Sequence, residues 1–159
     1  MSTKFLLPNA TETMSIFGML YGDNVSVDKT DKVIGVEESK LTGLFVDADG
    51  QPVAACMCDT PFAAYAGAAM TMLPPGGAQD AVEEDDISQT MKDNVYEVMN
   101  ICSRLMMSDD TPHLKLENMY DRSELSEEAL AMIEKAEGHK EFGVSFNNYG
   151  SGHISFVTS

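Results

Sequence analysis

The stretch between Asp85 and Met107 constrains the fold of this chain more than any other. It contains no glycine or proline, begins with acidic residues and has an arginine near its end, which is typical of a long helix. At about 100° per residue, one side of such a helix is a continuous apolar stripe. The stripe is formed by Ile87, Met91, Val95, Val98, Cys102 and Leu105. The opposite side carries Asp93, Glu97 and Asn100, with Arg104 one turn further along.

Charge and length limit the class of protein. The chain has 159 residues, of which 43% are hydrophobic, so we expect one domain, residues 1–159, with a sizeable core. Its formal net charge of −16 repels phosphate groups, so neither nucleic acid nor an anionic membrane is an expected partner. The sequence contains no apolar run long enough to span a membrane, and residues 1–13 do not resemble a secretion leader. We therefore expect a cytoplasmic protein.

The cysteines and histidines do not have the spacing of a metal site. Residues 53–58 alternate like a strand, which places Cys56 and Cys58 on the same side, where burial is the simplest outcome. We expect reduced, buried thiols and no metal or cofactor bound by this chain. The residues considered are Cys56, Cys58, Cys102, His113, His139 and His153.

The first half of the chain reads as a helix followed by β-structure. Residues 9–21 have a helical apolar pattern, with Asn9 or Thr11 as the N-cap. Residues 33–36 are expected to form a short strand. Residues 41–58 predict a hairpin, because two β-rich runs flank an Asp-Gly turn. Residues 61–72 predict a helix of small residues with Pro61 in its first turn, packed closely against the sheet or the long helix.

The second half supplies a further hairpin. Residues 73–86, with Pro-Pro-Gly-Gly and an acidic run, are expected to be a mobile loop that acts as a hinge. Residues 113–120 alternate like a strand, 123–136 predict a helix capped by Ser123 or Ser126, and 141–158 predict the second hairpin. The fold class is therefore α+β: one antiparallel sheet that contains both hairpins and packs against two or more helices. Residues 153–159 are expected to leave an exposed strand edge.

The polar residues of the long helix also resemble a known signature. Asp93, Glu97 and Asn100 match the D/S-x-x-x-E-x-x-N pattern of the CheC/CheX/FliY family of chemotaxis phosphatases. The family also has a hairpin, a small-residue helix and a loop before its motif helix, as residues 43–79 do here. A single copy of the motif is closest to the CheX branch. The resemblance covers most of the chain, with residues 121–138 as an apparent insertion.

The resemblance implies a reaction and a partner. A CheX-like protein hydrolyses the aspartyl phosphate of a CheY-like response-regulator receiver domain, which supplies its own Mg²⁺. By resemblance, Asn100 positions the attacking water and Glu97 pairs with a lysine of the receiver, which makes these two the expected catalytic residues. Asp93 and Arg104 are the expected partner contacts, although Asp93 could instead support the helix face. The resemblance also implies a homodimer.

Two positions depart from the family pattern and leave alternatives open. The family commonly has glycine where this chain has Arg104, and a downstream proline where residues 115–120 have none. Arg104 either obstructs docking or contacts a different partner. The alternative to a phosphatase is a non-catalytic module that binds a receiver or assembles a signalling complex. The simplest structural alternative is a solvated helix face on which Glu97 pairs weakly with Arg104 or Lys92.

Overall fold

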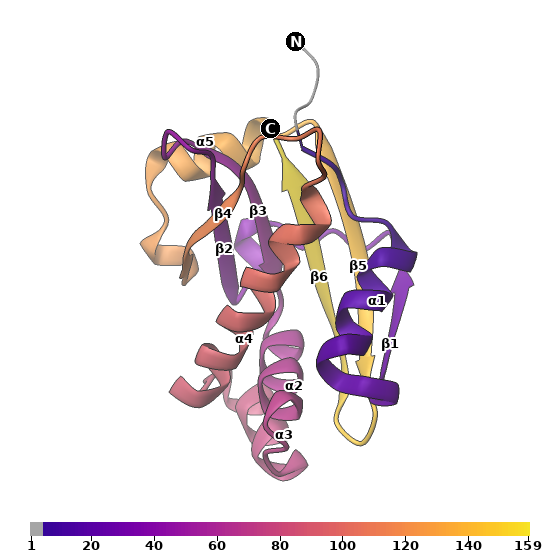
Figure 1. Ribbon diagram of the computed structural model, residues 1–159. Helices are drawn as coiled ribbons and strands as arrows, with labels where there is room; N and C mark the ends of the chain where they lie inside the picture. The colour runs from indigo at the N-terminus through magenta and orange to yellow at the C-terminus, as the bar shows by residue number, and fades with distance from the viewer. Residues whose placement is uncertain (1–4) are drawn as a thin grey trace.

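The computed structural model describes residues 5–159 as one six-stranded antiparallel sheet with helices on both faces (Figure 1). Residues 1–4, which the predicted domain also includes, lie outside the described residues. The strand order is β1-β5-β6-β3-β2-β4. The strands are β1 (Val25–Lys29), β2 (Leu41–Val46), β3 (Pro52–Cys58), β4 (Lys115–Tyr120), β5 (Gly138–Phe146) and β6 (Gly150–Thr158). The helices are α1 (Ala10–Tyr21), α2 (Thr60–Met70), α3 (Pro75–Glu84), α4 (Gln89–Cys102) and α5 (Glu127–Lys135).

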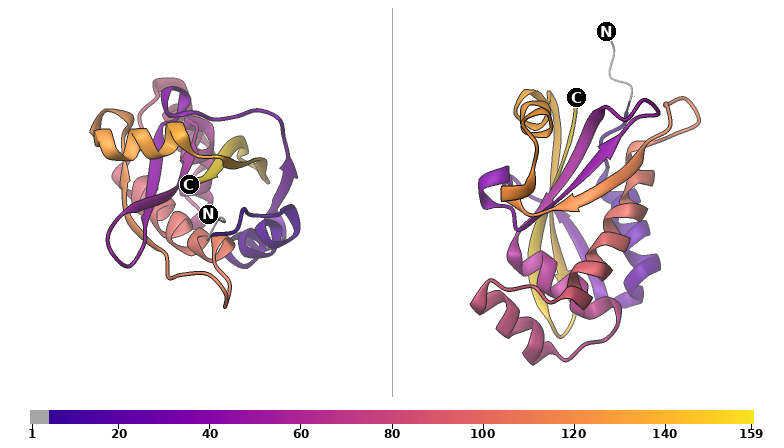
Figure 2. Two further views of the ribbon diagram at one scale, coloured as in Figure 1. Left: turned by 90° about the horizontal axis from the view of Figure 1, so that it is seen from above. Right: turned by 90° about the vertical axis from the view of Figure 1, so that its left-hand side faces the viewer.

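The helices divide unequally between the two faces of the sheet (Figure 2). α1, α2 and α4 cover one face, and their buried side chains form the larger core with those of the sheet. α5 lies on the other face over a smaller cluster that includes Ala55, Met57 and Val157. Alternation along β3 separates the two cores, because Cys56 and Cys58 belong to the larger cluster and Ala55 and Met57 to the smaller one.

The α+β prediction is confirmed, and so is the placement of both hairpins in one antiparallel sheet. β2 pairs with β3, β5 pairs with β6, and β3 joins the two hairpins by pairing with β6. The starts of α1 and α5 also show which of the two candidate residues caps each helix. Asn9 caps α1 through the Glu12 amide at 2.8 Å, and Ser126 caps α5 through the Ala129 amide at 3.1 Å.

The prediction of a mobile loop over residues 73–86 is wrong. Residues Pro75–Glu84 form α3, with Pro75 in the first turn, where its missing N–H is not needed. Ala78 and Ala81 are buried, and α3 packs against α2. The Pro-Pro-Gly-Gly sequence therefore marks the beginning of a helix, and tertiary burial of one alanine face stabilises it despite the two glycines.

The predicted strand at residues 33–36 is also wrong. The strand is β1, Val25–Lys29, which pairs with β5, while Val36–Glu38 form a 3₁₀ turn. Ile34 is buried beneath α5, and its amide donates to the Ser155 side chain of β6 at 2.8 Å rather than to the backbone of a neighbouring strand. The segment that follows β1 therefore crosses the face of the sheet as a loop.

The end of the chain does not leave an exposed strand edge. β6 pairs with β5 on one side and with β3 on the other, so residues 153–159 lie in the interior of the sheet. The edge strands are β1 and β4. Within residues 5–159, no helix is both long enough and apolar enough to cross a membrane.

Candidate functional site

α4 buries the predicted apolar stripe and exposes the predicted polar face. The Ser88 side chain caps its start by accepting from the Met91 amide at 3.2 Å. The helix begins four residues later than expected, because Asp85 adopts a left-handed conformation (φ 52°) that ends α3. After Cys102 the chain tightens into a 3₁₀ turn, Ser103–Met106, which carries Arg104. The stripe residues are all buried: Ile87, Met91, Val95, Val98, Cys102 and Leu105.

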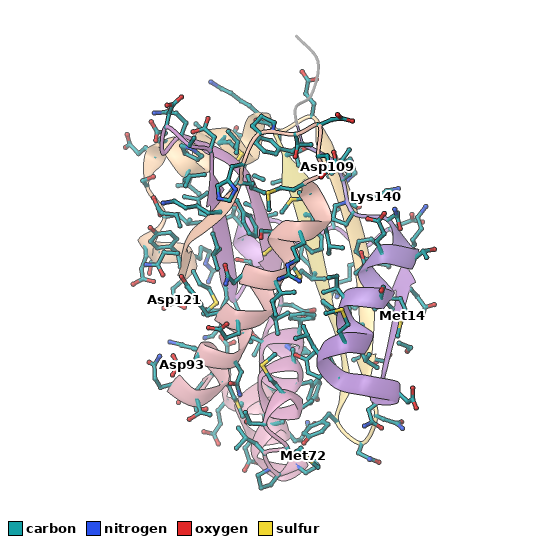
Figure 3. All side chains as sticks on the ribbon, viewed as in Figure 1. Met14, Met72, Asp93, Asp109, Asp121 and Lys140 are labelled. Carbon is teal, nitrogen blue, oxygen red and sulfur yellow. The ribbon has the colours of Figure 1, made fainter. Side chains whose placement is uncertain are left out.

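Asp93, Glu97, Asn100 and Arg104 are all exposed. The spacing of four and then three residues places the first three on one side of α4, over about 10 Å of helix length. Asp93, labelled in Figure 3, accepts a hydrogen bond from Gln89 Nε2 at 2.8 Å. Within residues 5–159, the side chains of Glu97 and Asn100 form no hydrogen bond or ion pair.

The ion pairs expected of a purely solvated face are not formed among the described residues. Glu97 is paired with neither Arg104 nor Lys92, and the three ion pairs of residues 5–159 lie elsewhere. The side-chain contact to Asn100 involves its backbone oxygen and not its amide group: the oxygen accepts a hydrogen bond from Ser103 Oγ at 2.8 Å. The amide of Asn100 and the carboxylate of Glu97 are therefore available to a partner.

The position of α4 is set by an unusually close contact with α2. A Cβ atom on Gly67 would lie 2.7 Å from the Met91 backbone oxygen, so only glycine allows the two helices to approach this closely. Beside this contact, Asn94 Nδ2 lies 2.8 Å from the Gly67 oxygen and 3.0 Å from Thr71 Oγ1. Asn94 thus ties α4 to the end of α2 on the side next to the exposed face.

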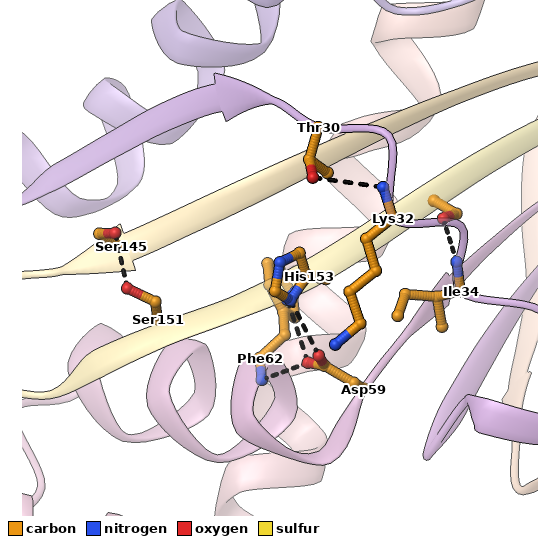
Figure 4. Close-up of polar contacts among 9 residues, drawn as sticks. Thr30, Lys32, Ile34, Asp59, Phe62, Ser145, Ser151 and His153 are labelled. Carbon is orange, nitrogen blue, oxygen red and sulfur yellow. Dashed lines mark hydrogen bonds and ion pairs between the residues drawn. The ribbon is translucent and has the colours of Figure 1, made fainter.

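α2 is in turn held against the sheet. Asp59 caps α2 by accepting from the Phe62 amide at 2.9 Å, and it also accepts from the His153 amide at 3.0 Å (Figure 4). The His153 imidazole lies 3.2 Å from the second oxygen of Asp59. Gly152 allows the backbone of α2 to rest directly on β6, since a Cβ there would lie 2.2 Å from the Phe62 nitrogen. The sheet, α2 and α4 therefore form one rigid support for the exposed face.

The loop before α4 is fixed by a charged cluster. Lys40 Nζ donates to the Asp85 backbone oxygen at 2.7 Å and lies 3.6 Å from its carboxylate, which also accepts from Thr60 Oγ1 at 2.5 Å. The hydrogen bond from Thr60, followed by the charge of Lys40, lowers the pKa of Asp85. A polar pocket of about 320 Å³ at this point also includes Lys92 and Arg122. Its lining mixes these cations with the carboxylates of Glu38, Asp86 and Asp121.

The buried titratable groups do not offer a nucleophile. All three cysteines are free and buried, and burial raises the pKa of Cys56 to about 12 and those of Cys58 and Cys102 well above the usual value. Burial also raises the pKa of Tyr21, whose hydroxyl donates to the Ala66 oxygen at 2.9 Å. Within residues 5–159, no three His, Cys, Asp or Glu side chains are grouped to hold a metal ion.

Sequence reasoning found the exposed residues of α4 but missed the residues that position them. The Asp59-Thr-Pro sequence is a readable capping signal for α2. Asn94 and Lys40 carry no such signal, because their partners, Gly67, Thr71 and Asp85, are distant in the sequence.

Comparison with known proteins gives similarity only at the level of structure. No protein-family profile and no curated protein matches the sequence. FliY from Thermotoga maritima aligns with a TM-score of 0.53 and 11% identity, over 92% of this chain and 82% of that chain. The FliM middle domain from H. pylori aligns with a TM-score of 0.51 and 8% identity, over 94% of this chain and 84% of that chain. Both alignments span more than nine tenths of this chain, and the chain therefore has the CheC/CheX/FliY-like fold.

Proposed function

We propose that this protein is a CheX-like phosphatase that hydrolyses the aspartyl phosphate of a CheY-like receiver domain. The observation that carries the proposal is the pair Glu97 and Asn100, both exposed on α4 and both without a hydrogen-bond or ion-pair partner among residues 5–159. The motif resemblance and the FliY-like fold support it as well. A rigid helix with an unengaged amide and carboxylate matches what the reaction requires.

The chemistry asks little of the phosphatase itself. The phosphoryl group of a receiver is already neutralised by the receiver's Mg²⁺ and lysine, so we propose that no metal or cofactor is bound by this chain. The missing element is a water molecule held in line with the leaving group. The amide of Asn100 can donate to and accept from that water without a change in its protonation state. Glu97, one turn earlier, would pair with the receiver's lysine and fix the docking register.

Arg104 favours the second candidate, a non-catalytic module that binds a receiver. It is exposed in the 3₁₀ turn that follows α4, at the position where the family commonly has glycine. Its long side chain either blocks close approach to Asn100 or forms a contact of its own with the partner. Arg104→Gly separates these possibilities, because it should raise the hydrolysis rate in the first case and weaken binding in the second.

The test uses a panel of phosphorylated receiver domains encoded by the same genome. If the protein is a phosphatase, the wild type should shorten the phosphoryl lifetime of at least one receiver. Glu97→Ala should then weaken binding more at low salt than at high salt. Glu128→Ala, which removes the same charge from α5 on the opposite face of the sheet, is the matched surface control. Receivers that bind tightly but keep their phosphoryl lifetime would support the binding module. A protein that binds no receiver would exclude both candidates.

We also propose that the protein acts in the cytoplasm as a homodimer. The edge strands β1 and β4 carry the unpaired backbone groups through which a second copy could add to the sheet. Light scattering across a wide range of concentrations tests the dimer, and a monomer mass throughout would exclude it.

A further inference from the structure

A groove on the face of the sheet opposite α4 has the features of a ligand site. It has a volume of about 610 Å³ and lies between α5, the segment 33–38 and the outer side of β3 and β6. Its walls include Val33, Leu130 and Ile133, and its floor is formed by the buried side chains of Met57 and Val157. This size and this predominantly apolar lining are those of pockets that hold small molecules.

Glutamates are the charged residues at the rim of the groove, beside the imidazole of His139. Glu37, Glu38 and Glu134 lie around it, and neither a lysine nor an arginine is among the residues that line it. Glu38 is engaged, since its Oε1 accepts from the Gly35 amide at 3.1 Å. Glu37 and Glu134 are exposed, and their carboxylates have no partner among residues 5–159. The one cation that hydrogen-bonds to this segment within the described part of the chain is Arg122, whose Nη1 donates to the backbone oxygen of Glu37. The imidazole of His139 also lines the groove and lies 2.9 Å from Glu141.

The apolar walls are not fully covered by the protein. Val33 is 54% exposed, although most large apolar side chains of the chain are buried. Leu130 and Ile133, which project from α5, are only partly buried. A ligand that covered these side chains would gain from the burial of apolar surface. The acidic rim would at the same time favour a cation and disfavour an anion.

We propose that this groove binds a small amphiphile with an apolar body and a cationic head group. The apolar body lies between α5 and the segment 33–36, and the head group lies at the rim between Glu37 and Glu134. The site is on the opposite face of the sheet from α4, and its occupancy does not depend on the proposed phosphatase activity (Figure 2).

The test compares three probes that share an octyl chain: octylammonium, 1-octanol and octanoate. Each is titrated below its micelle concentration into the isotope-labelled protein, and amide chemical shifts are followed by NMR. Octylammonium should shift residues 33–38 and 130–139 saturably, with a Kd at least about threefold lower than that of 1-octanol, as expected for weak exposed charge contacts. Octanoate should not saturate. Shifts elsewhere, or equal Kd values for the three probes, would overturn the proposal.

Paired variants test the two parts of the site. The double change Glu37→Gln, Glu134→Gln should remove the preference for octylammonium over 1-octanol, whereas Glu83→Gln, Glu84→Gln on α3 should leave it intact. Val33→Lys should abolish octylammonium binding, and Met72→Lys, at the far end of the molecule, should not (Figure 3).

Both Val33 and Met72 are exposed, so the folded spectrum of each lysine variant is expected to persist and serves as the check on folding. A Val33→Lys variant that still binds would overturn the proposal. The proposal would also be overturned if a second copy of the chain covered the groove. Light scattering at the NMR concentration detects such a dimer.

Discussion

Replacing Gly67 with alanine tests whether α2 and α4, which supports the candidate site, pack as closely as the structure shows. The new Cβ would lie 2.7 Å from the Met91 oxygen, 2.8 Å from its Cβ and 2.9 Å from its Cα. An ordinary contact begins at 3.4 Å, so α4 must move away from α2 by about 0.7 Å, which is 3.4 minus 2.7. None of these atoms can rotate out of the way.

The energetic result combines two opposing effects. Overpacking a core typically costs about 1–3 kcal/mol, and backbone neighbours place this site at the upper end. Alanine in place of glycine within a helix raises the free energy of unfolding by about 1 kcal/mol, through its higher helix propensity. We therefore expect Gly67→Ala to lower the free energy of unfolding by about 2 kcal/mol.

Gly18→Ala in α1 is the matched control. Its Cβ would meet only the end of the Met14 side chain, at 3.9 Å, so the helix-propensity gain should act alone and stabilise the protein by about 1 kcal/mol. Urea unfolding followed by circular dichroism measures both variants. If Gly67→Ala were as stabilising as Gly18→Ala, the tight α2–α4 contact would be refuted.

Three further predictions concern the rest of the molecule. Met72 is 86% exposed with φ 56°, so Met72→Gly should stabilise the protein by roughly 1 kcal/mol in urea unfolding, and a loss of stability would contradict the left-handed backbone. The pKa of Asp85 is lowered from 3.8, so its carboxylate stabilises the fold above the unfolded-state pKa and loses this effect as the pH falls through the folded-state pKa. Asp85→Asn should therefore reduce the free energy of unfolding at neutral pH by less than about 1 kcal/mol, because the carboxylate is largely exposed. The variant's stability should also depend less on pH in the acid range. An unchanged acid dependence would argue against the role of Thr60. The three buried cysteines should react with a thiol reagent only after unfolding, and fast labelling of the native protein would contradict their burial.

Local patterns in the sequence predicted α4 well because the information lies within one helix. The stripe from Ile87 to Leu105 has helical spacing, and its burial follows from amphipathicity alone. α3 was missed because proline and glycine have low helix propensity, whereas the packing of Ala78 and Ala81 against the core stabilises the helix.

The remaining differences depend on residues that are distant in the sequence. β1 is a strand because β5 offers it a pairing edge, and no pattern within five residues specifies that partner. Asn94 is a clamp only because the backbone of α2 lies beside it. In the candidate site, the exposed face of α4 and the close packing of the small-residue helix α2 were therefore predictable, whereas the side-chain contacts of Asn94 and Lys40 were not.

The most direct test of the proposed phosphatase is the hydrolysis rate at saturation. A phosphorylated receiver is mixed with enough wild-type or Asn100→Ala protein to bind all of it, so that differences in affinity do not affect the rate. We predict that the Asn100→Ala rate is lower by on the order of a hundredfold. Its free energy of unfolding should be almost unchanged, because Asn100 is exposed. Equal rates for the two proteins at saturation would contradict the proposed role of Asn100.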